Sequence, residues 1–103
     1  MSVLRPDNRS AWERSGVTLG AWRRMFGRLT ADHIAADHAL QTFFERTDRR
    51  WTAADAKEFL RQRDAARKLH DDWWNAMNGD GATIRSFVVD RYHLDPDDDH
   101  VGP

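Results

Sequence analysis

The chain has 103 residues, enough for one compact domain and too few for two. Its 16 Lys and Arg nearly balance 17 Asp and Glu, and the net charge of -1 excludes the strongly basic character of a protein that binds bulk phosphate. With 40% hydrophobic residues the chain can bury a core, so we expect it to fold. Cysteine is absent, which excludes disulfides, thiolate catalysis and Cys-ligated zinc.

Two further features of the composition concern where the protein is made and where it acts. No apolar run approaches the roughly 20 residues needed to cross a bilayer, and residues 1–8 lack the apolar segment of a secretory signal. We therefore expect a cytoplasmic protein without a membrane partner. The basic residues are 14 Arg and two Lys, and the acids are 14 Asp and three Glu. This bias is typical of GC-rich codons and indicates a high-GC bacterium or one of its phages.

The N-terminal half predicts a short helical turn followed by two amphipathic helices. Gly16 favours the end of the first turn. Thr18 is expected to cap a helix that ends near residue 29, because apolar residues recur there at spacings of three and four. Thr30 is expected to cap a second helix over 31–46.

The C-terminal half predicts one long helix and one short helix. The long helix spans 53–78, where neither Pro nor Gly occurs, and Thr52 with Asp55 resembles the capping box that starts such a helix. The sequence Asn-Gly-Asp-Gly at 78–81 ends it, because these residues tolerate positive φ. Residues 83–94 fit both helical and strand periodicity, and we favour a helix because no second strand is present for pairing.

These elements predict an all-α fold, a small helical bundle of three main helices plus a short N-terminal turn and a C-terminal helix. Residues 1–94 are expected to form a single helical domain, and 95–103 an acidic C-terminal tail. Ile34 falls outside the apolar stripe of its helix. The expected core consists of the large apolar residues of the helical stripes: Leu19, Trp22, Phe26, Leu40, Phe43, Phe44, Phe59, Leu60, Leu69, Trp73, Ile84 and Val88.

Histidines near acids are candidates for a carboxylate–imidazole metal site. They are His33 with Asp37, His93 with Asp90, and His38 and His70. Known bundle sites use several Glu and His from facing helices, whereas this chain has three Glu. The alternating acids at 95, 97 and 99 are followed by neither the Gly nor the Glu that a calcium loop needs. We therefore predict no metal and no cofactor.

No catalytic motif is present in the sequence. The chain lacks a nucleophile elbow, a glycine-rich phosphate loop and a His-Glu-x-x-His zinc motif. A helical domain of this size also offers little concave volume for a substrate. We expect neither enzymatic activity nor a small-molecule substrate.

Tryptophan is abundant, with five residues in the chain. Trp73 and Trp74 are adjacent on the long C-terminal helix and point about 100° apart, so a small domain has difficulty burying both. Asp71 and Asp72 precede them in the last turns of that helix, where the helix dipole disfavours acids. These four residues are our first predicted partner-binding site, since exposed aromatic residues are typical of binding hot spots. Burial of all five indoles in a core is the alternative.

Arginines supply a second predicted partner-binding site. Arg23, Arg24 and Arg28 lie together on the side of the 18–29 helix away from its apolar stripe. Such a cluster can contact phosphate or an acidic protein surface. An ordinary solvated helix face is the alternative.

The resulting hypothesis is a small non-enzymatic helical protein that binds another protein, from the host or a phage, as an adaptor, inhibitor or assembly factor. Self-association would also account for the surplus of aromatic residues. The alternative is a nucleic-acid-binding regulatory domain, which would use the arginines of the 18–29 helix or the C-terminal residues Arg85, Ser86 and Arg91.

Overall fold

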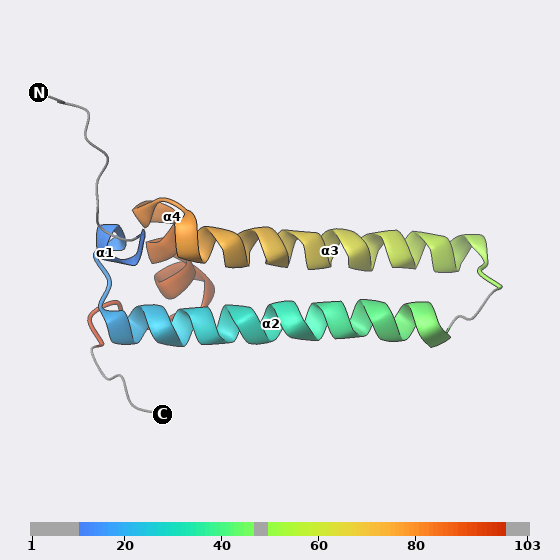
Figure 1. Cartoon of the computed structure of the whole chain (residues 1–103), viewed down its shortest axis with the longest axis horizontal. Coiled ribbons are helices and arrows are strands. Elements are labelled where there is room, and N and C mark those ends of the chain that lie inside the picture. The colour runs from blue at the N-terminus through green and yellow to red at the C-terminus, as the bar shows by residue number, and fades with distance from the viewer. Residues whose placement is uncertain (1–10, 47–49, 99–103) are drawn as a thin grey trace, which may run out of the picture. The chain divides into compact units, whose positions relative to one another are not determined.

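A computed structural model of the chain describes residues 11–46 and 50–98. The elements in these ranges are α1 (Ala11–Ser15), α2 (Leu19–Arg46), α3 (Ala53–Asn78), α4 (Gly81–Ser86) and the π-helix η1 (Phe87–Arg91), as Figure 1 shows. The described residues contain no strand, so the predicted all-α fold is confirmed. None of their helices combines the length and apolarity that a bilayer-spanning helix needs.

The first long helix is continuous where the sequence predicted two. α2 runs through Gly27 and Thr30 without a break. Thr30 does not cap a helix, because it lies inside α2, and its hydroxyl instead accepts a hydrogen bond from the indole Nε1 of Trp73 at 2.9 Å. A glycine inside a helix costs only about 1 kcal/mol, which the packing of α2 outweighs. The prediction of three main helices was therefore wrong, and the described residues contain two.

Local capping signals predicted two helix starts correctly. The hydroxyl of Thr18 accepts a hydrogen bond from the backbone N–H of Ala21 at 3.2 Å and so caps α2. At the start of α3, the N–H of Asp55 donates to the hydroxyl of Thr52 at 3.1 Å, and the N–H of Thr52 donates to the Asp55 carboxylate at 3.0 Å. This reciprocal pair is the predicted capping box, and α3 has the predicted bounds.

The C-terminal element is helical, as predicted, although it begins earlier than residue 83. Asp80 caps α4 by accepting a hydrogen bond from the N–H of Thr83 at 2.8 Å. That hydrogen bond lowers the pKa of Asp80 below its ordinary value. In η1 the N–H of Tyr92 donates to the carbonyl of Phe87, five residues earlier, at 3.1 Å. The helical interpretation of this segment is therefore confirmed over the strand alternative.

The chain divides into two compact units. Unit 1 comprises Met1–Met25 and Asn75–Pro103, and unit 2 comprises Phe26–Trp74. α1, α4 and η1 belong to unit 1, whereas α2 and α3 contribute residues to both units.

Unit 1 has a closed apolar core. Its buried hydrophobic residues, among those described, are Val17, Ala21, Met25, Ala76, Ile84 and Val88. α4 packs closely on α1, since a Cβ atom built on Gly81 would lie 2.4 Å from the carbonyl oxygen of Arg14. The indole Nε1 of Trp22 donates to the carbonyl of Ala76 at 3.0 Å. This hydrogen bond joins the beginning of α2 to the last turn of α3 within unit 1.

Part of the predicted acidic tail is hydrogen-bonded within unit 1. The N–H of Thr18 donates to the carbonyl of Pro96 at 2.9 Å, and the Thr18 hydroxyl donates to the carbonyl of Asp98. The Asp98 carboxylate lies 3.4 Å from the guanidinium Nε of Arg24. Residues 96 and 98 therefore lie beside the beginning of α2. Residues 99–103 of the predicted tail lie outside the described residues.

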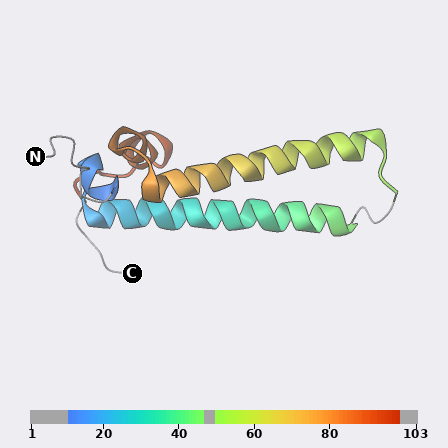
Figure 2. The same ribbon diagram turned by 45° about the horizontal axis from the view of Figure 1, so that its top comes forward.

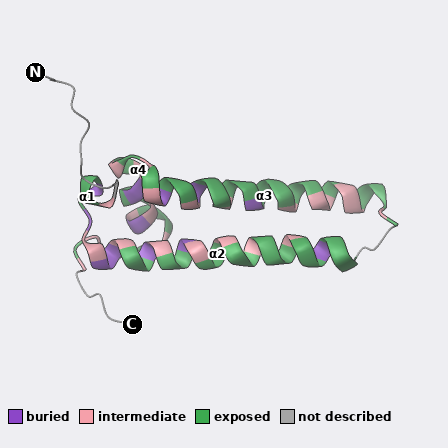
Figure 3. Ribbon diagram, viewed as in Figure 1, coloured by how far each residue is buried: buried purple, intermediate pink, exposed green. Residues whose placement is uncertain are grey.

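Unit 2 is a helical hairpin. Its parts of α2 and α3 lie side by side and run in opposite directions in both Figure 1 and Figure 2. The buried and half-buried positions recur at spacings of three and four, the pattern of a two-stranded coiled coil. They are Phe26, Leu29, His33, Ala36, Leu40 and Phe43 in α2, and Phe59, Gln62, Ala66, Leu69 and Trp73 in α3. Exposed positions predominate elsewhere on the hairpin, as Figure 3 shows.

Candidate protein-binding face

The two adjacent tryptophans have different environments. Trp73 is half-buried, and its ring stacks on Phe26 with a centroid separation of 5.7 Å and an interplanar angle of 28°. Its indole N–H is bonded to Thr30. Trp74 is 55% exposed, while the other described tryptophans are half-buried. Trp73 therefore belongs to the interior of unit 2, and Trp74 belongs to its surface.

The two acids before these tryptophans also differ. Asp71 is exposed and Asp72 is buried. The structure therefore presents Asp71 and Trp74 to solvent, whereas Asp72 is buried and Trp73 is half-buried. The four residues of the first predicted site do not form one surface.

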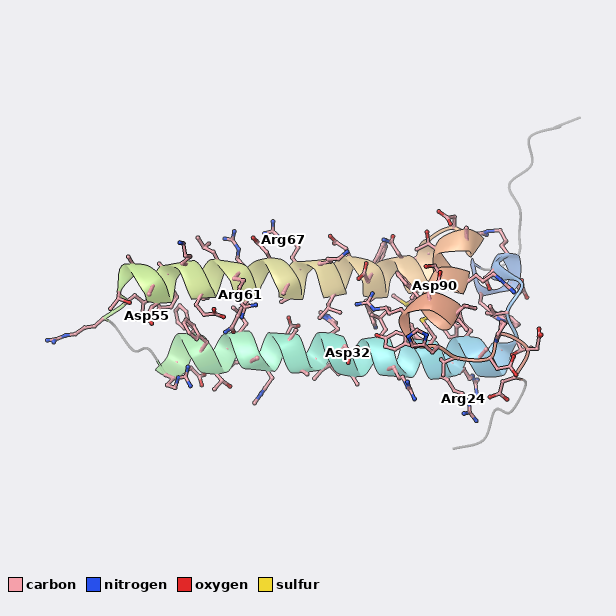
Figure 4. All side chains as sticks on the ribbon, turned by 180° about the vertical axis from the view of Figure 1, so that it is seen from behind. Arg24, Asp32, Asp55, Arg61, Arg67 and Asp90 are labelled. Carbon is pink, nitrogen blue, oxygen red and sulfur yellow. The ribbon has the colours of Figure 1, made fainter. Side chains whose placement is uncertain are left out.

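The predicted arginine site is exposed but distributed over both units. Arg23 and Arg24 belong to unit 1, where Arg24 pairs with Asp98, and Arg28 belongs to unit 2. All three side chains are accessible to solvent; Arg24 is labelled in Figure 4. The second predicted site stays a prediction.

The residues of the nucleic-acid alternative are exposed and in part engaged within unit 1. The hydroxyl of Ser86 donates to the carboxylate of Asp90 at 3.2 Å. The guanidinium of Arg91 lies over the rings of Phe87 and Tyr92, 5.5 and 5.6 Å from their centroids. Arg85 lines a groove of about 360 Å³ together with Asp90. An acid in the same groove opposes phosphate binding there.

Among the described residues, four large apolar side chains are exposed, and all of them belong to unit 2. They are Ile34 at 61%, Phe44 at 58%, Trp74 at 55% and Leu60 at 47%. Phe44 and Leu60 were expected in the core, and this expectation was wrong. Periodicity identifies a helical stripe, but a pair of helices covers only the part of the stripe that faces the partner helix.

Three of these residues can be placed on one side of the hairpin. Phe44 is seven residues from Asp37 in α2, and Leu60 and Trp74 are each seven residues from Arg67 in α3. Because seven residues are about two helical turns, each set lies along one line of its helix. Asp37 and Arg67 line the same groove of about 320 Å³ between the two helices. Phe44, Leu60 and Trp74 therefore share the side of the hairpin on which this groove opens.

Ile34 does not share this surface, because it lies four residues before His38, which lines a groove on the other side of the hairpin. We call Phe44, Leu60 and Trp74 the apolar face. Of these three residues, the sequence predicted only Trp74 as part of a binding site.

The opposite side of the hairpin has a different composition. Ala39 and Ala65 are each two residues, or about 200°, away from Asp37 and Arg67 around their helices. The grooves on this side, of about 330 and 270 Å³, are lined by His38, Ala39, Thr42, Phe43, Arg46 and Gln62, and by Ala36, Ala39, Arg61, Gln62 and Ala65. Phe43 is buried, and the rest of the lining is alanine or polar. Phe44, Leu60 and Trp74 therefore have no counterpart among the residues that line the grooves on this side.

A polar cluster occupies the middle of the groove beside the apolar face. The rings of His33 and His70 are 5.3 Å apart, and Nε2 of His33 lies 3.7 Å from the carboxylate of Asp37. Arg63 and Arg67 also line this groove. Among the described residues, no three His, Cys, Asp or Glu side chains are arranged to hold a metal ion. The cluster is therefore a charged interruption of an otherwise apolar surface.

A second ionic cluster lies elsewhere on α3. Arg61 Nε donates to both carboxylate oxygens of Glu58, at 3.0 and 3.1 Å, and Gln62 donates to Glu58 at 2.9 Å. The hydrogen bonds from Arg61 and then Gln62 lower the pKa of Glu58 to about 2. Glu58 and Arg61 are therefore paired with each other on the alanine-lined side of the hairpin.

Comparison with known proteins gives no relative. No protein-family model, no curated protein and no solved structure matches this chain. A functional assignment therefore depends on the chemistry of the surfaces described above.

Proposed function

We propose that this chain is a non-enzymatic helical protein that acts by binding another protein through the apolar face of unit 2. One observation carries the proposal: three large apolar side chains of the described residues, each about half exposed or more, lie on one side of a single hairpin. Single exposed apolar residues are ordinary on protein surfaces, but a patch that collects them on one side is typical of an interaction site.

The residue types of the face fit protein recognition. Trp74 and Phe44 supply large aromatic surfaces, and Arg67 lies on the same line of α3 as Trp74. Tryptophan and arginine are enriched among residues that contribute most to protein–protein binding. The packing of Trp73 on Phe26 fixes the helix turn that carries Trp74, so little conformational entropy is lost there on binding.

The setting we propose is the cytoplasm of a high-GC bacterium or of its phage-infected cell, with a role as an adaptor, inhibitor or assembly factor. The nucleic-acid alternative has less support. Arg91 lies over its own neighbouring rings, and Asp90 shares the groove of Arg85.

Site-specific photo-crosslinking tests the proposed function. A benzophenone amino acid at position 60 lies on the apolar face, and the same amino acid at position 65 is the matched control, exposed on the other side of α3. In producing cells, we expect position 60 to give protein adducts and position 65 to give few or none. Equal yields at both positions, or adducts with nucleic acid alone, would overturn the proposal.

A further inference from the structure

We infer that the partner of the apolar face is a second copy of this chain, and that two copies of unit 2 pair face to face as a four-helix bundle. The inference rests on the proposed function, because it uses the same face and names its partner. Self-complementarity of unit 2, in apolar surface and in charge, is the argument for it.

The need for a second helical layer follows from the sparse core of unit 2. Its buried hydrophobic residues, among those described, are Leu29, Phe43 and Ala66. Two helices in contact bury only the seam between them, whereas a bundle of four also buries the inner flanks. A second hairpin placed on the apolar face would supply that layer and leave the alanine-lined side in solvent.

The two helices of the hairpin are in a defined register. Thr30 lies opposite Trp73, to which it is hydrogen-bonded, and the Phe44 ring lies 6.1 Å from that of Phe59. The seven-residue spacing of the seam keeps this register between these two contacts. Asp37, midway between Thr30 and Phe44, therefore lies level with the middle of the paired segment of α3.

A two-fold axis parallel to the helices gives Phe44 and Asp37 of one copy matching neighbours in the second. Rotation about this axis keeps every residue at its own level and puts α2 of one copy over α3 of the other. Phe44 of one copy then meets Leu60 of the second, at the level where Phe44 faces Phe59 within its own hairpin. By the same register, Asp37 of one copy meets Arg67 of the second.

Charge favours this arrangement over the one that stacks like helices. The α2 edge of the groove carries Asp37, and the α3 edge carries Arg63 and Arg67. Stacking α2 on α2 would bring two Asp37 carboxylates together, whereas stacking α2 on α3 joins acid to base. The apolar contacts supply the affinity, and the charged middle selects the register, because desolvation offsets much of the attraction of a covered ion pair.

Charge exchange tests the inference on the full chain by light scattering and sedimentation equilibrium. We expect a mass of 24 kDa, twice the 12.0 kDa of one chain. Asp37→Arg and Arg67→Asp each place like charges together, so each variant should raise the dimer Kd about tenfold or more. Mixing the two variants should restore the dimer, because each copy then offers the charges that the other needs. Lys68→Asp, the same change on the other side of α3, is the matched control and should leave the Kd unchanged.

The outcomes separate this inference from the proposed function. A wild-type chain that stays at 12.0 kDa at high micromolar concentration overturns self-association, and an adduct from position 60 with a different protein would then leave the proposed function standing. A dimer that is insensitive to both charge variants and to Trp74→Ala overturns the assignment of the face. Absence of any adduct at position 60 together with a monomeric chain overturns both. Circular dichroism of each variant shows that it is folded.

Discussion

Among the described residues, unit 1 leaves no large apolar side chain exposed, whereas unit 2 leaves four of its own exposed. Of the large side chains that are fully buried among the described residues, Met25, Ile84 and Val88 belong to unit 1, and only Leu29 belongs to unit 2. The same two helices, α2 and α3, contribute to both units. What distinguishes the units is that α1, α4 and η1 add further layers in unit 1. The best-buried core and the proposed binding surface therefore belong to different parts of one chain.

The largest expected effect contrasts one apolar truncation in each unit. Ile84→Ala removes a fully buried side chain from unit 1 and should lower the free energy of unfolding by about 2–5 kcal/mol. Leu60→Ala removes a side chain that is 47% exposed and should cost under about 1 kcal/mol in the monomer. Urea denaturation at low protein concentration measures both. Equal losses would remove the distinction between the units.

Two glycine substitutions, one in each unit, should change stability in opposite directions. Gly81→Ala places a Cβ atom 2.4 Å from the carbonyl of Arg14 and should destabilise unit 1 by about 1–3 kcal/mol. Gly27→Ala, in the part of α2 that belongs to unit 2, meets nothing within 4 Å and should stabilise the helix by about 0.5–1 kcal/mol. Thermal melts of the two variants should shift in opposite directions. A shift in the same direction would contradict the close packing of α1 on α4.

A smaller effect is expected where unit 2 satisfies a polar group internally. Thr30→Val keeps the side-chain shape but removes the acceptor of the Trp73 indole N–H, which should cost about 1 kcal/mol. Thr42→Val, at an exposed position of the same helix, is the control and should change stability little. Hydrogen exchange of the indole N–H provides a direct reading. Unchanged exchange in Thr30→Val would show that this hydrogen bond does not hold Trp73.

The smallest expected effect is on the loss of stability at acidic pH. The pKa of Asp80 is lower in the folded chain than its ordinary value near 3.8, so its contribution to stability is present above that pH and is lost as the pH falls through the folded pKa. Asp80→Asn keeps a capping side chain but does not titrate. Stability measured from pH 5 down to pH 2 should therefore fall less steeply in this variant. Parallel curves would show that the α4 cap does not contribute to the acid response.

The features that sequence predicted well depend on neighbours within a few residues. Thr18 caps α2, and Thr52 with Asp55 caps α3, because each hydrogen bond spans only three residues. Thr30 carried the same local signal but lies inside a helix. Its hydroxyl is satisfied by Trp73, 43 residues away, and no local pattern contains that contact.

The candidate site was predictable only in part for a similar reason. Trp74 was found because two adjacent indoles on one helix cannot face the same way. Phe44 and Leu60 were assigned to the core, since they fit apolar stripes, and only the number of helices packed against a stripe decides whether it is covered. With three main helices, a third helix could have covered these side chains. Because α2 is continuous, the hairpin has no such third helix.

The bonds from Thr18 to the carbonyls of residues 96 and 98 have a consequence for biosynthesis. Unit 1 draws on segments at either side of unit 2 in the sequence, so its core cannot close until the ribosome has released the second segment. Residues 26–74 are contiguous and can pair while synthesis continues. In a nascent chain stalled before α4 emerges, unit 2 could thus be formed while unit 1 is incomplete, and the apolar face would be accessible to chaperones and to neighbouring nascent chains.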